Sequence, residues 1–142
     1  MTRNEMFEDI VGLLGGRAAE EIVFQDITTG ASNDIDRASA TARDMVARYG
    51  MSKALGTISY HSDDEVFIGG SYGKTKSYSE DVAGQIDGEV KRVIDTAYAK
   101  TLELLGTHRD KLDAVSEYLL KHENMTGEQF ESVMEGNPIE EA

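Results

Sequence analysis

The sequence has no cysteine in its 142 residues, which excludes both a disulfide framework and a thiolate metal site. This absence is typical of a protein in a reducing compartment. No run approaches the roughly 18 apolar residues that a membrane span needs, and the N-terminal residues lack the apolar core of a signal peptide. Taken alone, these residues predict a soluble chain.

Basic residues are scarce relative to acidic ones. The 14 Lys and Arg residues stand against 27 Asp and Glu residues, which gives a formal net charge of −13. A nucleic-acid-binding surface requires clustered Lys and Arg, and anionic lipid headgroups repel an acidic chain. We therefore expect no nucleic-acid partner and no membrane docking through these residues.

Hydrophobic periodicity predicts a mainly α fold, a helical bundle-like domain with one short β-hairpin. The expected helices cover 2–24, 33–49, 79–106, a region around 112–120, and a last helix that begins at the cap Thr126 and buries Phe130 and Val133. No internal repeat or interdomain linker is visible. We expect residues 1–136 to form one domain and 137–142 to form a disordered acidic tail.

Two short runs rich in β-forming residues, 57–60 and 65–68, predict the β-hairpin, with its turn at 61–64. A glycine-rich loop over 69–73 is expected to follow it. The run GGSYGKT imitates a phosphate-binding loop, but that motif needs four residues between its outer glycines and this run has three. We therefore predict no cofactor-binding site in this loop.

The helix expected over 33–49 carries an aspartate at the edge of its apolar face. On a wheel of about 100° per residue with Asp34 at zero, the apolar side chains fall between about 20° and 120°. These side chains are Ile35, Ala38, Ala42, Met45, Val46 and Tyr49. Asp34 therefore borders the buried face, whereas Asp36 points away. Spacing alone leaves two interpretations: Asp34 complements the dipole of a helix capped by Ser32 or Asn33, or it is a metal ligand at the rim of a pocket.

The N-terminal helix contains a stripe of small residues that would let a partner helix approach closely. Its members are Gly12, Gly16, Ala19 and Val23. Glu20 lies beside this stripe, and Glu21 lies about 100° further round, four residues after Arg17, with which it can pair. From the pattern alone, Glu20 is either a carboxylate near a site or a solvated side chain on the helix flank.

Three runs, LLGGRAAEEIVF, TTGASNDIDRASATARDMVARYGMS and LGTISY, resemble the peptidase domain of the FtsH family of ATP-dependent zinc metalloproteases. The resemblance continues to MTGEQFESV and covers about 4–135. It implies a zinc metalloendopeptidase that degrades unfolded or membrane proteins as a six-membered ring on the cytoplasmic side of the cell membrane. ATP and Mg²⁺ would be bound by an ATPase module that these residues do not include. The protein would reach the membrane through segments that these residues do not include either.

The resemblance also assigns roles to two residues. It implies that Asp34, in TTGASND, is the third protein ligand of the catalytic Zn²⁺, and that Glu20, in the AEE run, lies near the metal and orients a zinc-bound histidine. The family's other two zinc ligands and its general base come from an H-E-x-x-H helix. This sequence has no such motif, because none of its three histidines has a second histidine four residues later. These histidines are His61, in the predicted hairpin turn, His108 and His122.

We therefore interpret the chain as an incomplete peptidase domain that begins downstream of the H-E-x-x-H helix. It contains no catalytic residue of its own and is expected to be inactive alone, because one aspartate cannot hold Zn²⁺ against water. A non-enzymatic alternative stays open, in which the chain is a helical assembly module. Without the zinc-binding helix the small-residue stripe would be uncovered, so we also expect self-association.

Overall fold

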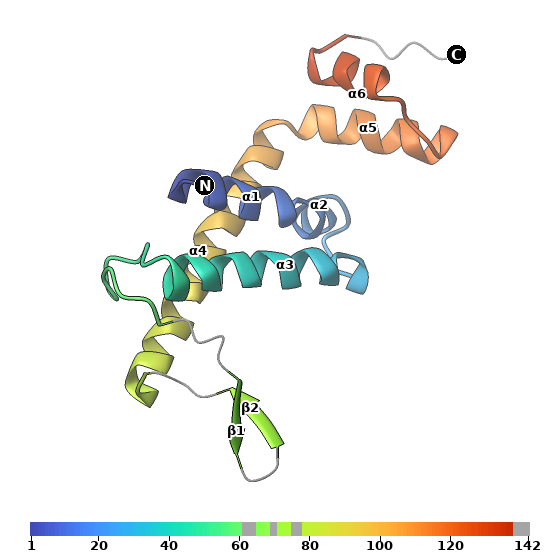
Figure 1. The fold of residues 1–142 in the computed structure, drawn as a ribbon. Helices are drawn as coiled ribbons and strands as arrows, with labels where there is room; N and C mark the ends of the chain where they lie inside the picture. Colours follow the sequence, from blue (N-terminus) through green and yellow to red (C-terminus); the bar gives the residue numbers. More distant parts are fainter. Residues whose placement is uncertain (61–64, 69–70, 75–77, 138–142) are drawn as a thin grey trace.

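The computed structural model describes residues 1–60, 65–68, 71–74 and 78–137. The fold is mainly helical, as the sequence predicts (Figure 1). In chain order the elements are α1 (Arg3–Leu13), α2 (Gly15–Phe24), the 3₁₀ turn η1 (Thr29–Ala31), α3 (Ser32–Arg43), the π-helical turn η2 (Asp44–Arg48), β1 (Glu65–Ile68), β2 (Ser71–Lys74), α4 (Glu80–Thr107), α5 (Arg109–His122) and α6 (Gly127–Met134). Within this part of the chain, no helix has the length and apolar character to cross a membrane.

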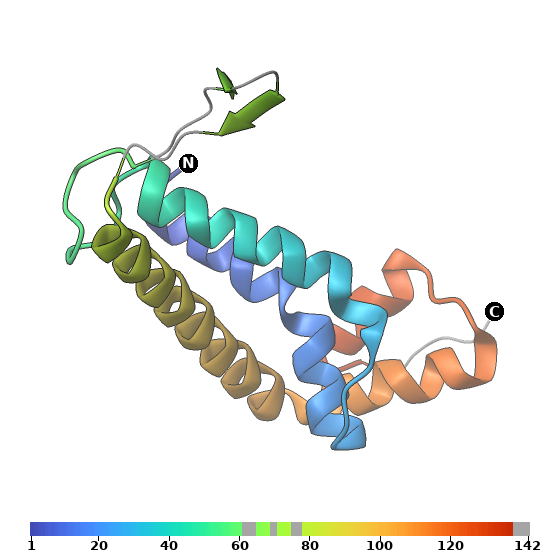
Figure 2. The ribbon, with the colours of Figure 1, turned by 90° about the horizontal axis from the view of Figure 1, so that it is seen from below.

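The core lies where α1, α3 and α4 pack together. α1 and α3 run side by side, and α4 packs against both (Figures 1 and 2). The largest fully buried side chains come from α1, η2 and α4, and they are Ile10, Val46 and Ile86. Burying a side chain of this size stabilises the fold by about 1.5–3 kcal/mol. The pair β1–β2 and the pair α5–α6 lie beyond opposite ends of α4 (Figure 1).

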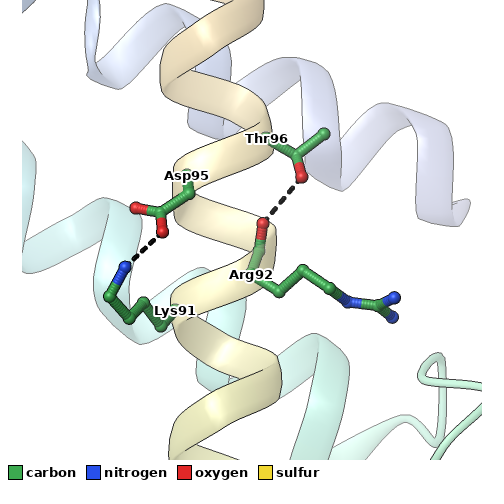
Figure 3. A network of polar contacts seen from close by, with 4 residues as sticks. All are labelled: Lys91, Arg92, Asp95 and Thr96. Atoms are coloured by element: carbon green, nitrogen blue, oxygen red, sulfur yellow. Dashed lines mark hydrogen bonds and ion pairs between the residues drawn. The ribbon is translucent and has the colours of Figure 1, made fainter.

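The solvent side of α4 is polar. Lys91 pairs with Asp95 one turn later, and Thr96 Oγ1 donates to the Arg92 carbonyl oxygen at 2.8 Å (Figure 3). The Arg92 side chain points away from Lys91 and Asp95, and its Nε lies 2.8 Å from the carboxylate of Glu89, which is 9% exposed. The buried carboxylate is therefore paired, as burial of a charge requires.

The N-terminal segment forms two helices rather than the single helix predicted over 2–24. The break lies at Leu14, whose φ of −82° and ψ of −4° close α1 and open α2 in a new direction (Figure 1). The two glycines that follow Leu14 have low helix propensity and do not oppose the break. The predicted stripe is therefore not continuous. A Cβ built on Gly12 or on Gly16 would meet nothing within 4 Å in the described part of the chain.

The end of the second predicted helix is wider than an α-helix. In η2 the Tyr49 N–H donates to the Asp44 carbonyl oxygen at 2.9 Å, five residues back. In the wider turn each residue advances by less than the roughly 100° of an α-helix, so the following side chains point in other directions than the wheel predicts. As a result Ala47, which the wheel places outside, is 8% exposed, and Tyr49, predicted to be buried, is 53% exposed. The predicted stop is confirmed at Gly50, whose φ is +61°.

The structure contains one β-hairpin, but its strands are 65–68 and 71–74 rather than the predicted 57–60 and 65–68. The second predicted strand is β1, but it pairs antiparallel with β2, with Glu65 opposite Lys74 and Ile68 opposite Ser71. Residues 57–60 form no strand, and the Tyr60 N–H donates instead to the carbonyl oxygen of Ala47 in η2. Composition identified β1 but could not specify its partner, because register depends on packing.

The structure tests only part of the predictions for the turn at 61–64 and the loop over 69–73. Most of the predicted glycine-rich loop over 69–73 is strand β2, which begins at Ser71. The predicted turn at 61–64, which includes His61, and the two glycines at 69–70 lie outside the described residues.

The last helix, α6, begins as predicted. Thr126 Oγ1 accepts from the Gln129 N–H at 3.2 Å, and the Gln129 side chain accepts from the Thr126 N–H at 2.9 Å. Val133 is buried, but Phe130, also predicted to be buried, is 47% exposed. Within the described residues α6 packs mainly on α5, so one narrow face of α6 is covered and Phe130 lies at its edge. The tail over 138–142 lies outside the described residues.

Candidate metal-ligand site

The turn that carries Asp34 is built from a 3₁₀ turn joined directly to α3. Thr28 is extended, with φ of −122° and ψ of 177°, and its Oγ1 accepts from the Gly30 N–H at 3.1 Å. η1 then leads into α3, which has Ala31 at its N-cap position and no capping side chain. The caps proposed from the sequence, Ser32 and Asn33, are therefore not used. η1 takes the place of a capping side chain by leading the backbone into the helix.

Asp34 lies in the first turn of α3, at the boundary that the wheel predicts. Its side chain is 46% exposed, and Arg37 Nη1 lies 3.9 Å from its Oδ1. An exposed pair at this distance contributes about 0–1 kcal/mol, so it leaves the carboxylate accessible to a stronger cation. Asp36 is exposed, as predicted. The position of Asp34 agrees with both interpretations, a helix-dipole partner and a metal ligand.

Two side chains of α2 hold the loop that precedes Asp34. Glu20 Oε2 accepts from the Thr28 N–H at 2.7 Å, and Arg17 Nη2 donates to the Thr28 carbonyl oxygen at 3.0 Å. Both backbone polar groups of Thr28 are therefore bonded to side chains one helical turn apart. A Cβ on Gly30 would lie 3.3 Å from Thr28 Oγ1 and 3.9 Å from Glu20 Oε1, so the loop also fits closely against itself.

The role of Arg17 was not predicted from the sequence. Its spacing predicted an ion pair with Glu21, four residues later, whereas Glu21 accepts a hydrogen bond from the hydroxyl of Tyr98 on α4. The spacing of Arg17 and Glu20, which puts them on one face of a helix, was the signal available in the sequence. The neighbouring glutamates therefore have different surroundings, as predicted: Glu20 faces the loop and Glu21 faces α4.

The contact with Glu21 changes the acidity of Tyr98. Partial burial, and then the hydrogen bond to Glu21 and the negative charge of that carboxylate, raise the pKa of Tyr98 from 10.0 to about 12. All three favour the neutral phenol, because ionisation would place two negative charges side by side. The bond between α2 and α4 therefore persists only while Tyr98 keeps its proton.

The free energy of unfolding is expected to fall as pH rises from 10 to about 12. In this window the unfolded chain has released the Tyr98 proton while the folded chain still holds it, so rising pH favours unfolding. Urea titrations at a series of pH values, for the original chain and for Tyr98→Phe, measure this effect. The difference in stability between the two should shrink across the window, and a constant difference would contradict the assignment.

The described residues do not form a complete zinc site. Catalytic zinc usually takes three protein ligands, and no three His, Asp or Glu side chains in the described ranges gather closely enough to hold a metal ion. His122 stacks on Tyr118, with ring centroids 4.4 Å apart, and His108 precedes α5, so neither joins Asp34 in such a group. Asp34 alone fits one coordination position, as an accessible carboxylate on a rigid helix start.

Comparison with known proteins identifies the domain to which this turn belongs. The sequence model of Peptidase family M41 matches residues 1–133. The protein named ATP-dependent zinc metalloprotease FtsH 1 from Thermoanaerobacter sp. (strain X514) is 48% identical over 141 residues, which are 99% of this chain and 23% of that protein. The FtsH proteins of Lactococcus lactis subsp. lactis and Kosmotoga olearia are 48% and 44% identical over 132 and 135 residues, which are 93% and 94% of this chain and 19% and 21% of the relatives.

The helical bundle and the TTGASND turn are thus parts of a peptidase domain. The chain belongs to peptidase family M41, and its peptidase domain is of the FtsH type. It spans about a fifth of the length of the curated relatives that it matches.

Proposed function

We propose that this chain supplies Asp34 as the third protein ligand of the Zn²⁺ in an ATP-dependent metalloendopeptidase. The observation that carries the proposal is the placement of Asp34. It is half exposed, the nearest cation in the part of the chain that the structure describes is 3.9 Å away, and it follows a turn whose backbone is fixed from α2. The similarity to proteins named zinc metalloproteases supports the identity of the metal.

In this proposal the remaining ligands, two histidines, and the general base lie outside the 142 residues. Zinc, when bound, lowers the pKa of a coordinated water to about 7 and polarises a peptide carbonyl. The residues of this chain hold one carboxylate in place for that ion. A helix start supported by packing and hydrogen bonds is suited to this task, because a ligand must be held to within about 0.5 Å of its working position.

We also propose that residues 1–136 act as one domain of a larger assembly. The names of the relatives support coupling of proteolysis to ATP, which with Mg²⁺ would be bound by a separate ATPase module. The assembly would be a homo-oligomer, a six-membered ring on the cytoplasmic side of the cell membrane, and its substrates would be unfolded or membrane proteins. Gly12 on α1 and Gly16 on α2 each leave open space in the described part of the chain, where a neighbouring helix of that larger structure would fit.

A purified polypeptide of these 142 residues is expected to show no chelator-sensitive peptidase activity. The reason is that a single carboxylate ligand cannot hold Zn²⁺ in competition with water. Hydrolysis of fluorescently labelled casein, measured with zinc and with a chelator, tests this expectation, and the full-length protease is the positive control. Casein hydrolysis that copurifies with the short chain and stops on chelation would contradict the proposed division of ligands.

A further inference from the structure

We propose that Arg17 and Glu20 together are positioning residues for Asp34, and that they act through the backbone of Thr28. This inference rests on the proposed function, because it concerns the zinc ligand that the function requires. Neither side chain is suggested to contact zinc or substrate. Their task is to fix the loop from which α3 begins.

The path from these side chains to Asp34 is short and stiff. Thr28 is held on both sides, at its N–H by Glu20 and at its carbonyl oxygen by Arg17. Its Oγ1 then holds the Gly30 N–H, and the following residue, Ala31, is 5% exposed and anchors the end of η1. α3 starts at the next residue, so release of Thr28 would free the whole turn before Asp34.

Arg17 occupies a place that stability alone does not explain. Its Nε is buried and has no hydrogen-bond partner in the part of the chain that the structure describes. An unsatisfied buried donor is destabilising, since it loses its hydration without a replacement. The same side chain places Nη2 on the Thr28 carbonyl oxygen. A role in holding the loop accounts for retaining a guanidinium in this environment.

Arg17 also separates this inference from the role that the family resemblance implies for Glu20. A carboxylate that orients a zinc-bound histidine accepts a hydrogen bond from that histidine. A guanidinium can only donate, so Arg17 cannot substitute in such an arrangement. If the loop is the common target, removing either side chain has the same consequence for zinc binding.

The test measures zinc affinity in the full-length protease by competition with a zinc chelator of known affinity. Glu20→Ala and Arg17→Met are each expected to weaken zinc binding by about 10–100-fold, the usual effect of removing a group that orients a metal ligand. Glu20→Gln is expected to stay within about threefold of the original protein, since its amide oxygen still accepts from the Thr28 N–H. Glu21→Ala is the matched control, because the adjacent glutamate contacts Tyr98 instead, and it should leave zinc affinity unchanged.

A second measurement uses the 142-residue chain without metal. Hydrogen exchange followed by NMR should show faster exchange of the Thr28 amide in Glu20→Ala and unchanged exchange in Glu21→Ala, because only Glu20 accepts from that amide. Protected amides in α1 and α4 would show that both variants fold. Equal Thr28 exchange in the two folded variants would overturn the inference.

The outcomes distinguish this inference from the proposed function. Zinc loss in Asp34→Ala together with normal zinc affinity in Glu20→Ala and Arg17→Met would keep the proposed function and overturn the positioning role. Weakened binding in Glu20→Ala with normal binding in Arg17→Met would also overturn it, in favour of a direct contact of Glu20 with a histidine. Normal zinc binding in Asp34→Ala would overturn the proposed function and, with it, the inference.

Discussion

Replacing Asp34 with alanine in the full-length protease is expected to remove most of its bound zinc and nearly all of its peptidase activity. Under the proposed assignment of ligands two histidines would remain, and a site with two protein ligands holds zinc poorly. The loss should exceed the roughly 10–100-fold that removal of an outer-shell partner costs. Zinc content measured by atomic absorption after gel filtration, together with the rate of casein hydrolysis, gives both readouts.

The matched control is Asp36→Ala. Asp36 is also an acidic residue near the start of α3, but it is exposed on the side away from the bundle. If Asp34 only complements the helix dipole, both substitutions should have small effects, of about 0.3–1 kcal/mol on stability and none on zinc. Near-normal turnover and zinc content in Asp34→Ala would therefore reject the ligand role and leave the helix-start interpretation.

Truncating Ile10 to alanine is expected to lower the free energy of unfolding by about 2–5 kcal/mol. Ile10 is completely buried on α1, in the core cluster that includes Ala38 of α3 and Ile86 of α4. Its removal leaves a cavity that these helices cannot close without moving. Because domains are stable by only about 5–15 kcal/mol, the loss is a large part of the total.

Urea denaturation of the 142-residue chain, followed by circular dichroism, measures this loss as a shift of the midpoint. Leu120→Ala is the control, since it removes a similar aliphatic side chain that is 87% exposed, and it should change stability by no more than about 0.5 kcal/mol. Equal shifts for the two variants would contradict the assignment of the core to the α1, α3 and α4 contact.

The helices could be predicted where local rules agree. Residue spacing of three and four, the capping box at Thr2 and Glu5, and the left-handed Gly50 fix most helix ends without knowledge of the fold. The break at Leu14 and the π-helical turn were not predictable in the same way. Both are small changes of backbone geometry that tertiary packing selects, and each one displaced the expected faces of the following residues.

The candidate site shows the same division. The position of Asp34 at the boundary of the bundle follows from helical periodicity, whereas its proposed metal role depends on the family resemblance. The contacts of Thr28 with Arg17 and Glu20 join residues across a loop, and the contact of Tyr98 with Glu21 spans 77 residues. The spacing of Arg17 and Glu20 indicates that they share a face of α2, but no period in a single sequence reveals which loop or helix residue each side chain contacts.

The continuity of α4 limits how this domain can change its length during evolution. It packs on α1, α2, α3 and η2. In its first half Asp87 pairs with Arg43 of α3, and in its second half Thr101 Oγ1 donates to the Val11 carbonyl oxygen of α1 at 3.1 Å. One residue inserted between Val90 and Ala97 would rotate the second half by about 100° and shift it by about 1.5 Å. Both halves could not then keep their partners. The exposed positions of α4 can therefore vary in identity, whereas insertions and deletions should be confined to the connections outside it.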